Sequence, residues 1–122
     1  MLEERDMTNH EQIQISDKIF VDVGIAPLVQ LIRGMGINTE FSCEGYPWEA
    51  RYEDLYLAYI LMEYTTKSFV LASTLLYSNF LDTAIEKVSP NTMRDYPALI
   101  LRFRHEDLGK IYDLFSSVKF AN

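Results

Sequence analysis

The amino-acid sequence predicts an α+β fold, a two-layer α/β sandwich in which helices pack against one β-sheet. Its 122 residues fit a single domain, and its 48% hydrophobic and 13% aromatic content can build one core and excludes wholesale disorder. Helical and strand-like patterns alternate along the chain. They predict the order helix, strand, strand, helix, strand, helix, with a short N-terminal edge strand before the first helix.

The N-terminal part of the chain divides into a leader, an extended segment and a helix. Residues 1–12 are polar and show no periodicity, which predicts a flexible leader and a single globular domain over residues 13–122. Short apolar patches between residues 13 and 23 indicate either an extended segment or the edge strand. Helical spacing of apolar residues predicts a helix over residues 25–32, with Pro27 in its first turn, where a missing N–H costs no bond.

The middle of the chain predicts two neighbouring strands and a long helix. Residues 37–42 are typical of a strand that enters a loop over residues 43–48, which contains Gly, Pro and two aromatic residues. Residues 55–64 have the length and composition of a central strand and are expected beside the first. Apolar residues at three- and four-residue steps then predict a long helix over residues 67–88, ended by Pro90.

The C-terminal part predicts a third strand and a last helix. The third strand is predicted over residues 98–104, which follow Pro97 and whose last four residues alternate between apolar and basic side chains. Residues 105–118 carry an apolar stripe at helical spacing, with Glu106 and Asp107 in the first turn, where carboxylates favour the helix dipole.

Charge and cysteine content exclude several classes of protein. The net charge of −7 argues against direct nucleic-acid binding, because a polyanion repels phosphate backbones. This charge is uneven: residues 1–64 carry −8, from 12 acidic and 4 basic side chains, and residues 65–122 carry +1, from 7 basic and 6 acidic ones. A single cysteine, Cys43, excludes an intramolecular disulfide framework and a cysteine-cluster zinc site, and it indicates a reducing, cytoplasmic location.

Neither a membrane span nor a signal peptide is expected. The longest apolar stretch, around residues 69–76, falls far short of the roughly 20 residues that cross a bilayer and is interrupted by Ser73 and Thr74. The acidic first residues, 1–6, lack the basic region with which signal peptides begin.

The corner that follows the first predicted strand is the best candidate for a ligand site. Ligands bind at such strand ends in open α/β sheets. Gly45 allows a positive φ or a close approach of a ligand, and the aromatic side chains offer flat faces for stacking. Two arginines on one face of the third strand could hold one anionic group together. The predicted ligand-binding residues are Ser42, Cys43, Glu44, Gly45, Tyr46, Trp48, Arg51, Arg102 and Arg104.

Each of these features also has a purely structural interpretation. The corner could be a tight turn whose aromatic side chains pack on the core, and the arginines could form salt bridges with nearby glutamates on a solvated face. A catalytic Cys43 would need Glu44 or His105 as a partner, whereas a buried structural thiol needs none. Two histidines and scattered carboxylates show no metal-ligand spacing, so no metal site is predicted.

Residues 21–46 resemble two groups of proteins. The segment V-D-V-G-I-A-P-L-V, residues 21–29, and the later S-C-E-G, residues 42–45, resemble small phage-associated proteins of unassigned function that share D-x-G-I-x-P-L-V and T-x-x-S-C-[EQ]-G. More distantly, they resemble the tRNA wybutosine-synthesis methyltransferase family. That second resemblance implies AdoMet as cofactor and places Ser42 and Cys43 in the site, but Tyr46 stands where that family has Arg.

The leading functional hypothesis is a module that binds a small nucleotide-like ligand, without strong catalytic machinery or a cofactor. By analogy with the phage-associated proteins, it could be an accessory protein that sequesters a nucleotide signal. One alternative is a methyltransferase-like enzyme, and another is an acidic inhibitor that mimics nucleic acid and blocks a basic protein. Eight Tyr and seven Phe are many for one small core, which predicts a homo-oligomer.

Overall fold

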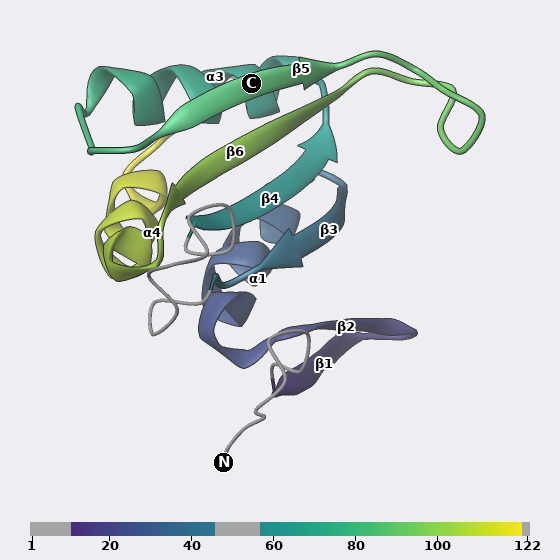
Figure 1. Cartoon of the computed structure of the whole chain (residues 1–122), viewed down its shortest axis with the longest axis horizontal. Helices are drawn as coiled ribbons and strands as arrows, with labels where there is room; N and C mark the ends of the chain where they lie inside the picture. Colours follow the sequence, from purple (N-terminus) through teal and green to yellow (C-terminus); the bar gives the residue numbers. More distant parts are fainter. Residues whose placement is uncertain (1–10, 46–56, 121–122) are drawn as a thin grey trace.

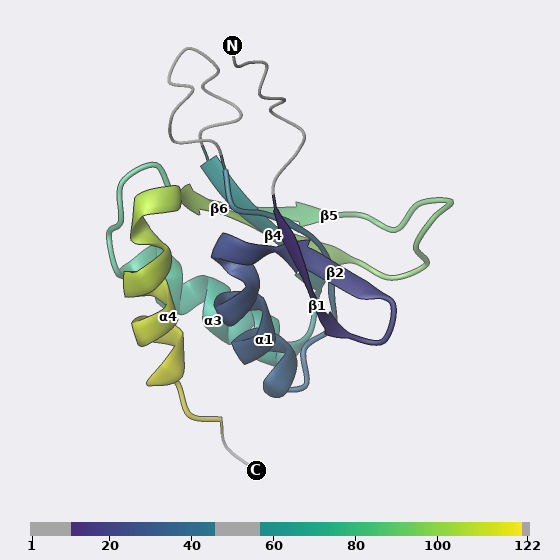
Figure 2. The ribbon, with the colours of Figure 1, turned by 90° about the horizontal axis from the view of Figure 1, so that it is seen from below.

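A four-stranded antiparallel sheet with three α-helices on one side forms the body of the molecule (Figures 1 and 2). The computed structural model describes residues 11–45 and 57–120. The strand order is β3-β4-β6-β5, so the two central strands are β4 and β6. The bounds are β3 (Thr39–Cys43), β4 (Leu57–Glu63), β5 (Ala84–Val88) and β6 (Ala98–Arg104). The predicted α+β class is confirmed.

Two of the helices are preceded by a short 3-10 turn. The turn η1 (Val23–Ile25) leads into α1 (Ala26–Gly34), with a proline in the first helical turn as predicted. Likewise, η2 (His105–Asp107) leads into α4 (Leu108–Ser116). The third helix, α3 (Thr66–Tyr77), begins at a capping box, in which the backbone N–H of Ser68 donates to the hydroxyl of Thr65 and the Ser68 hydroxyl accepts from the Thr65 N–H.

The N-terminal apolar patches form a hairpin of their own. Strands β1 (Gln12–Ser16) and β2 (Ile19–Asp22) pair antiparallel around a tight turn, in which Lys18 has a φ of 63°. The hairpin is a separate two-stranded sheet, so the prediction of an edge strand on the main sheet is wrong. Both patches are extended, but they satisfy their backbone hydrogen bonds with each other.

The predicted helix over residues 67–88 is also wrong in its second half. Helix α3 ends at Tyr77, and residues 84–88 form the edge strand β5, which pairs with β6 through partners such as Ile85 and Leu101. Asn79 and Asp82 have φ values of 60° and 57°, the left-handed conformation that stops a helix, and asparagine tolerates it well. The observed order therefore contains six strands where four were predicted, because the N-terminal segment forms two strands and β5 replaces the end of a helix: β1-β2-η1-α1-β3-β4-α3-β5-β6-η2-α4.

The core lies between the sheet and the helices. On β4 and β6, alternate residues point at the helices and are buried: Ala58, Ile60, Met62, Leu99, Leu101 and Phe103. The residues between them point to the other side, which none of the described helices covers and which we call the open face. Among the residues that the structure describes, no helix is both long and apolar enough to span a membrane.

Candidate functional site

The corner after β3 is tied to the start of α1 by four residues, which we call the corner latch: Asp22, Gly24, Glu44 and His105. The backbone N–H of Glu44 donates to Oδ2 of Asp22 at 3.0 Å, and the N–H of Gly24 donates to Oε1 of Glu44 at 2.6 Å. The Glu44 carbonyl oxygen accepts a hydrogen bond from Nδ1 of His105 at 2.5 Å. The corner latch thus joins β2, β3 and η2 at one point.

The geometry of the corner latch explains why glycines stand in this segment. A Cβ on Gly24 would lie 2.5 Å from Oε1 of Glu44, so a side chain at this position would displace the carboxylate from its present place. Gly45 has a φ of 86°, the left-handed region that favours glycine, and it is buried. The residues of the D-x-G and E-G motifs, Asp22, Gly24, Glu44 and Gly45, therefore have a structural role, because they hold the segment after β3 against the segment before α1.

Cys43 is half-buried beside the corner latch and is not an activated nucleophile. Burial raises the pKa of its thiol; the N–H of Gly45, 3.5 Å from Sγ, pulls this pKa down, and the nearby Asp22 carboxylate raises it again. A raised pKa keeps the thiol protonated near neutral pH. Nδ1 of His105 lies 2.5 Å from the Glu44 carbonyl oxygen, and among the described residues no hydrogen bond joins Cys43 to a histidine.

Cys43 opens a cross-strand row on the open face. In the register of the sheet, Cys43 lies opposite Tyr59, and Tyr59 lies opposite Arg102. Residues directly opposite each other project to the same face, so thiol, phenol ring and guanidinium lie side by side. Burial and the nearby Cys43 and Asp22 raise the pKa of Tyr59, and Arg102 lowers it. Tyr59 remains 36% exposed, and Phe41, also on this face, is 59% exposed.

Both arginines of β6 are paired with carboxylates. Nη1 of Arg102 lies 2.9 Å from Oε1 of Glu86 on β5, and both side chains are largely exposed. Nη2 of Arg104 lies 2.8 Å from Oε2 of Glu106, and its Nε lies 3.9 Å from Asp82. The structural interpretation, salt bridges to nearby glutamates, is therefore what the structure shows, and each arginine has its own partner.

Of the nine predicted ligand-binding residues, the six that the structure describes do not form one cluster. Cys43, Arg102 and Arg104 lie on the open face, whereas Glu44 and Gly45 are used in and beside the corner latch. Ser42 lies opposite the buried Ile60 and so projects to the helix side. The other three, Tyr46, Trp48 and Arg51, lie outside the described residues.

Sequence reasoning missed Phe41 and Tyr59 as members of the site. Tyr59 stands in a strand in which nearly every residue is apolar, so the sequence pattern carries no signal for its exposure. In the structure Ala58 and Ile60 are fully buried, and the alternation of the strand puts Tyr59 on the opposite side of β4.

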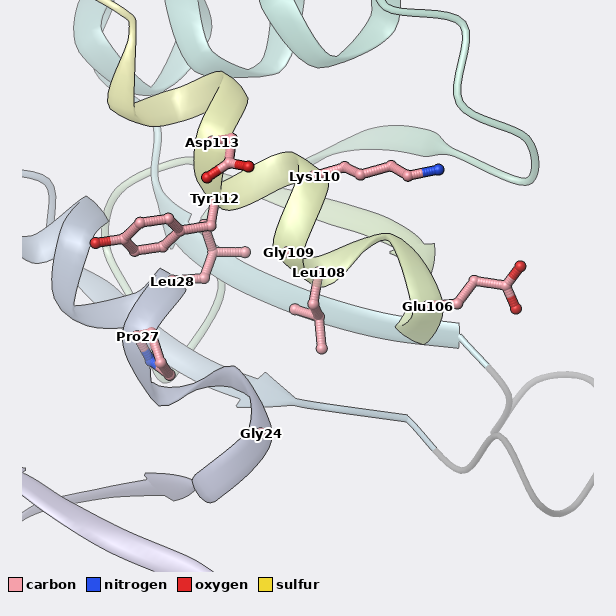
Figure 3. Close-up of a pocket in the computed structure, with 9 residues that line it drawn as sticks. All are labelled: Gly24, Pro27, Leu28, Glu106, Leu108, Gly109, Lys110, Tyr112 and Asp113. Carbon is pink, nitrogen blue, oxygen red and sulfur yellow. The ribbon is translucent and has the colours of Figure 1, made fainter.

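A groove on the helix side is a second concave feature. It measures about 500 Å³ and lies between the start of α1 and α4 (Figure 3). Its lining is mostly apolar, and Figure 3 shows the Tyr112 ring pointing toward α1 while Lys110 and Glu106 point away from it. None of the six predicted ligand-binding residues that the structure describes lines this groove, although Gly24 of the corner latch does.

Comparisons with known proteins leave the geometry as the main guide to function. In the described part of the chain, no group of three or more His, Cys, Asp or Glu side chains is placed to hold a metal ion. The resemblances of residues 21–46, and the cofactor and substrate that they imply, stay predictions. No family model matches this chain, and no match is found among curated proteins or among solved structures.

Proposed function

We propose that the open face binds a small nucleotide-like ligand, that is, a flat aromatic ring that carries a phosphate or a similar anion. The observation that carries this proposal is the cross-strand row in which Tyr59 lies beside Arg102, on the side of the sheet opposite the described helices. One side chain of the pair is suited to stacking, and the other to binding an anion.

The two halves of such a ligand match the two ends of the row. A base stacks on an aromatic side chain with about 1–3 kcal/mol per ring, and Tyr59 and the more exposed Phe41 both offer a ring on this face. A guanidinium can hold a phosphate through two parallel hydrogen bonds. Glu86, the present partner of Arg102, is itself 58% exposed, so it can turn into solvent when a phosphate replaces it.

The charge of the chain favours a small ligand over a polymer. Residues 1–64, which include β3 and all of the corner latch except His105, carry −8. A polynucleotide would have to bring many phosphates over this region, whereas a mononucleotide places one or two of them beside Arg102.

The groove on the helix side suits an anionic ligand less well. Its charged lining consists of two carboxylates, Glu106 and Asp113, and one ammonium group, Lys110. An anion would therefore meet a net negative rim there, so the proposal rests on the open face and uses the groove as its control.

The test is a thermal-shift panel followed by calorimetric titration of the ligands that shift the midpoint. The panel contains linear and cyclic mononucleotides, a nucleoside, inorganic phosphate and AdoMet. We expect a nucleotide to raise the unfolding midpoint more than the nucleoside or phosphate alone. Arg102→Ala and Tyr59→Leu should each remove the effect.

Lys110→Ala, in the groove, is the matched control and should leave the shift unchanged. No stabilisation by any nucleotide, or a shift that Lys110→Ala removes and Arg102→Ala does not, contradicts the proposal. A shift produced by AdoMet alone would favour the methyltransferase-like alternative instead. Indifference to every ligand, together with salt-sensitive binding to a basic protein, would favour the acidic inhibitor.

A further inference from the structure

Helix α3 is exposed to solvent on a face that is almost wholly apolar. Phe69 is 53% exposed, Leu76 is 51% exposed and Tyr77 is 86% exposed. Together with the half-buried Val70 and Ser73 they form one stripe, because their spacing of i, i+1, i+4, i+7 and i+8 places them on one side of a helix. We call these five residues the α3 stripe.

The opposite face of α3 already serves the core. Ser68, Leu71, Ala72 and Leu75 are buried against the rest of the molecule. Only one charged residue, Lys67, occurs in the helix; its Nζ donates to the Met35 carbonyl at 2.9 Å and lies over the Phe120 ring. A helix that is apolar on both faces is typical of one covered on both sides. The described chain covers only one of them.

The α3 stripe has the symmetry that pairing with its own copy requires. An interface between two identical chains around a twofold axis must be self-complementary. The stripe has the same pattern on both sides of Ser73: two residues that do not belong to it, then two apolar residues that do. Toward the C-terminus these are Leu76 and Tyr77, and toward the N-terminus they are Val70 and Phe69. Two antiparallel α3 helices that cross at Ser73 thus place Phe69 against the partner's Tyr77 and Val70 against the partner's Leu76.

The size and charge of the stripe fit a weak dimer. A fully exposed large side chain presents on the order of 200 Å², so Phe69, Leu76 and Tyr77 offer roughly 400 Å² per chain. With Val70 and Ser73 added, two copies bury about 800–1,000 Å², the low end for specific association. No charged residue belongs to the stripe, so two chains of net charge −7 can meet there without bringing carboxylates together.

We infer that a second copy of this chain covers the α3 stripe, with the two α3 helices antiparallel and crossing at Ser73. The small side chain of Ser73 lets the helix axes approach closely at the crossing point. Figure 1 shows α3 along the β5 edge, away from the β1–β2 hairpin, and in the layer of helices. Pairing there leaves the open face uncovered, so the dimer and the proposed ligand site are independent.

Sedimentation velocity of the full chain over about 1–300 μM tests this inference. We expect the mass to rise from 14.2 kDa toward twice that value with a dissociation constant in the micromolar range. Leu76→Glu should weaken the dimer at least about tenfold, because it buries a carboxylate without a partner. Met93→Glu is the matched control, since Met93 is 87% exposed and lies outside the stripe.

Cysteine cross-linking tests the crossing point separately. In a Cys43→Ala background, Ser73→Cys should form a disulfide-linked dimer under mild oxidation, because residue 73 of one chain lies next to residue 73 of the other at the crossing point. Ser116→Cys, at an exposed position on α4, should not. Circular dichroism and the thermal midpoint show that each variant is folded.

A wild-type chain that stays at 14.2 kDa up to 300 μM would overturn the inference, whatever the variants do. So would a dimer that survives Leu76→Glu, or equal cross-linking through residues 73 and 116. A monomer whose stripe instead binds a different protein counts against the second copy as its occupant.

Discussion

The two faces of the sheet are built from the same strands but have opposite compositions. On β6, Leu101 and Phe103 are fully buried under the helices, and Arg102, which stands between them, projects to the open face. On β4, Tyr59 stands in the same way between the buried Ala58 and Ile60. On these two strands the covered face is apolar, whereas the open face combines the buried Leu61 and Ala98 with aromatic rings and guanidinium groups. The largest losses of stability are therefore expected on the covered face, and the polar side chains of the proposed ligand site lie on the open face.

The largest expected effect compares neighbouring residues of β6. Phe103→Ala should lower the free energy of unfolding by about 3–5 kcal/mol, because it leaves a cavity in the core. Arg102→Ala should lower it by less than about 1 kcal/mol, because its ion pair with Glu86 is exposed. Urea denaturation of both variants gives the two values. Similar losses of unfolding free energy in the two variants would contradict the difference between the two faces.

The contrast between the faces could be predicted for β6 and not for β4. Strand β6 was predicted with its observed bounds, and its alternation of Leu101 and Phe103 with Arg102 and Arg104 gives both faces directly. In β4 nearly every residue is apolar, so the pattern does not tell which side the helices cover. The exposure of Tyr59 follows only from the packed structure.

Two other features could not be predicted from the sequence, because they depend on contacts between segments that lie far apart in the chain. Ile85 and Val88 are three residues apart and fit a helix as well as a strand; pairing with β6 decides in favour of a strand. The corner latch joins Gly24 to Glu44 across twenty residues. The glycines at both ends were visible in the sequence, but their contact depends on how β2 and β3 lie beside each other.

The next effect concerns the corner latch and asks whether it is structural. Gly24→Ala should displace the Glu44 carboxylate and weaken the exposed hydrogen bond that it accepts, at a cost of about 0.5–1.5 kcal/mol. Glu44→Ala should cost about the same. In the double variant the two losses should not add, because both remove one interaction. Additive losses in urea denaturation would show that the two residues act separately.

A more gradual effect is expected at alkaline pH. Folding raises the pKa of Cys43 above 9.0 and of Tyr59 above 10.0 through burial, and that of Tyr96 above 10.0 because its O–H donates to Glu40. Above these ordinary values the unfolded chain loses protons that the folded chain keeps. Stability should therefore be complete below about pH 9 and fall as the pH rises through the folded pKa values.

Denaturation midpoints between pH 7 and pH 11 measure this decline. Tyr96→Phe keeps the ring but has no proton to lose, so its decline should be shallower than that of the wild type. If the midpoint of Tyr96→Phe falls with pH as steeply as that of the wild type, the hydrogen bond to Glu40 does not hold the Tyr96 phenol neutral. A denaturation midpoint that increases as the pH is raised beyond 9 would be the opposite of the expected trend and would contradict the burial of Cys43 and Tyr59.

The smallest effect on stability is expected at Glu86, where the open face can be tuned without touching the core. Glu86→Gln removes the carboxylate that pairs with Arg102, and because both side chains are exposed the free energy of unfolding should change by less than about 0.5 kcal/mol. The same change should tighten binding of a phosphate-bearing ligand severalfold, because the ligand no longer competes with a carboxylate. The gain should shrink as salt is added. Tighter binding at unchanged stability is what separates a recognition face from a structural one, whereas a stability loss without a change in affinity would assign the Arg102–Glu86 pair to the fold.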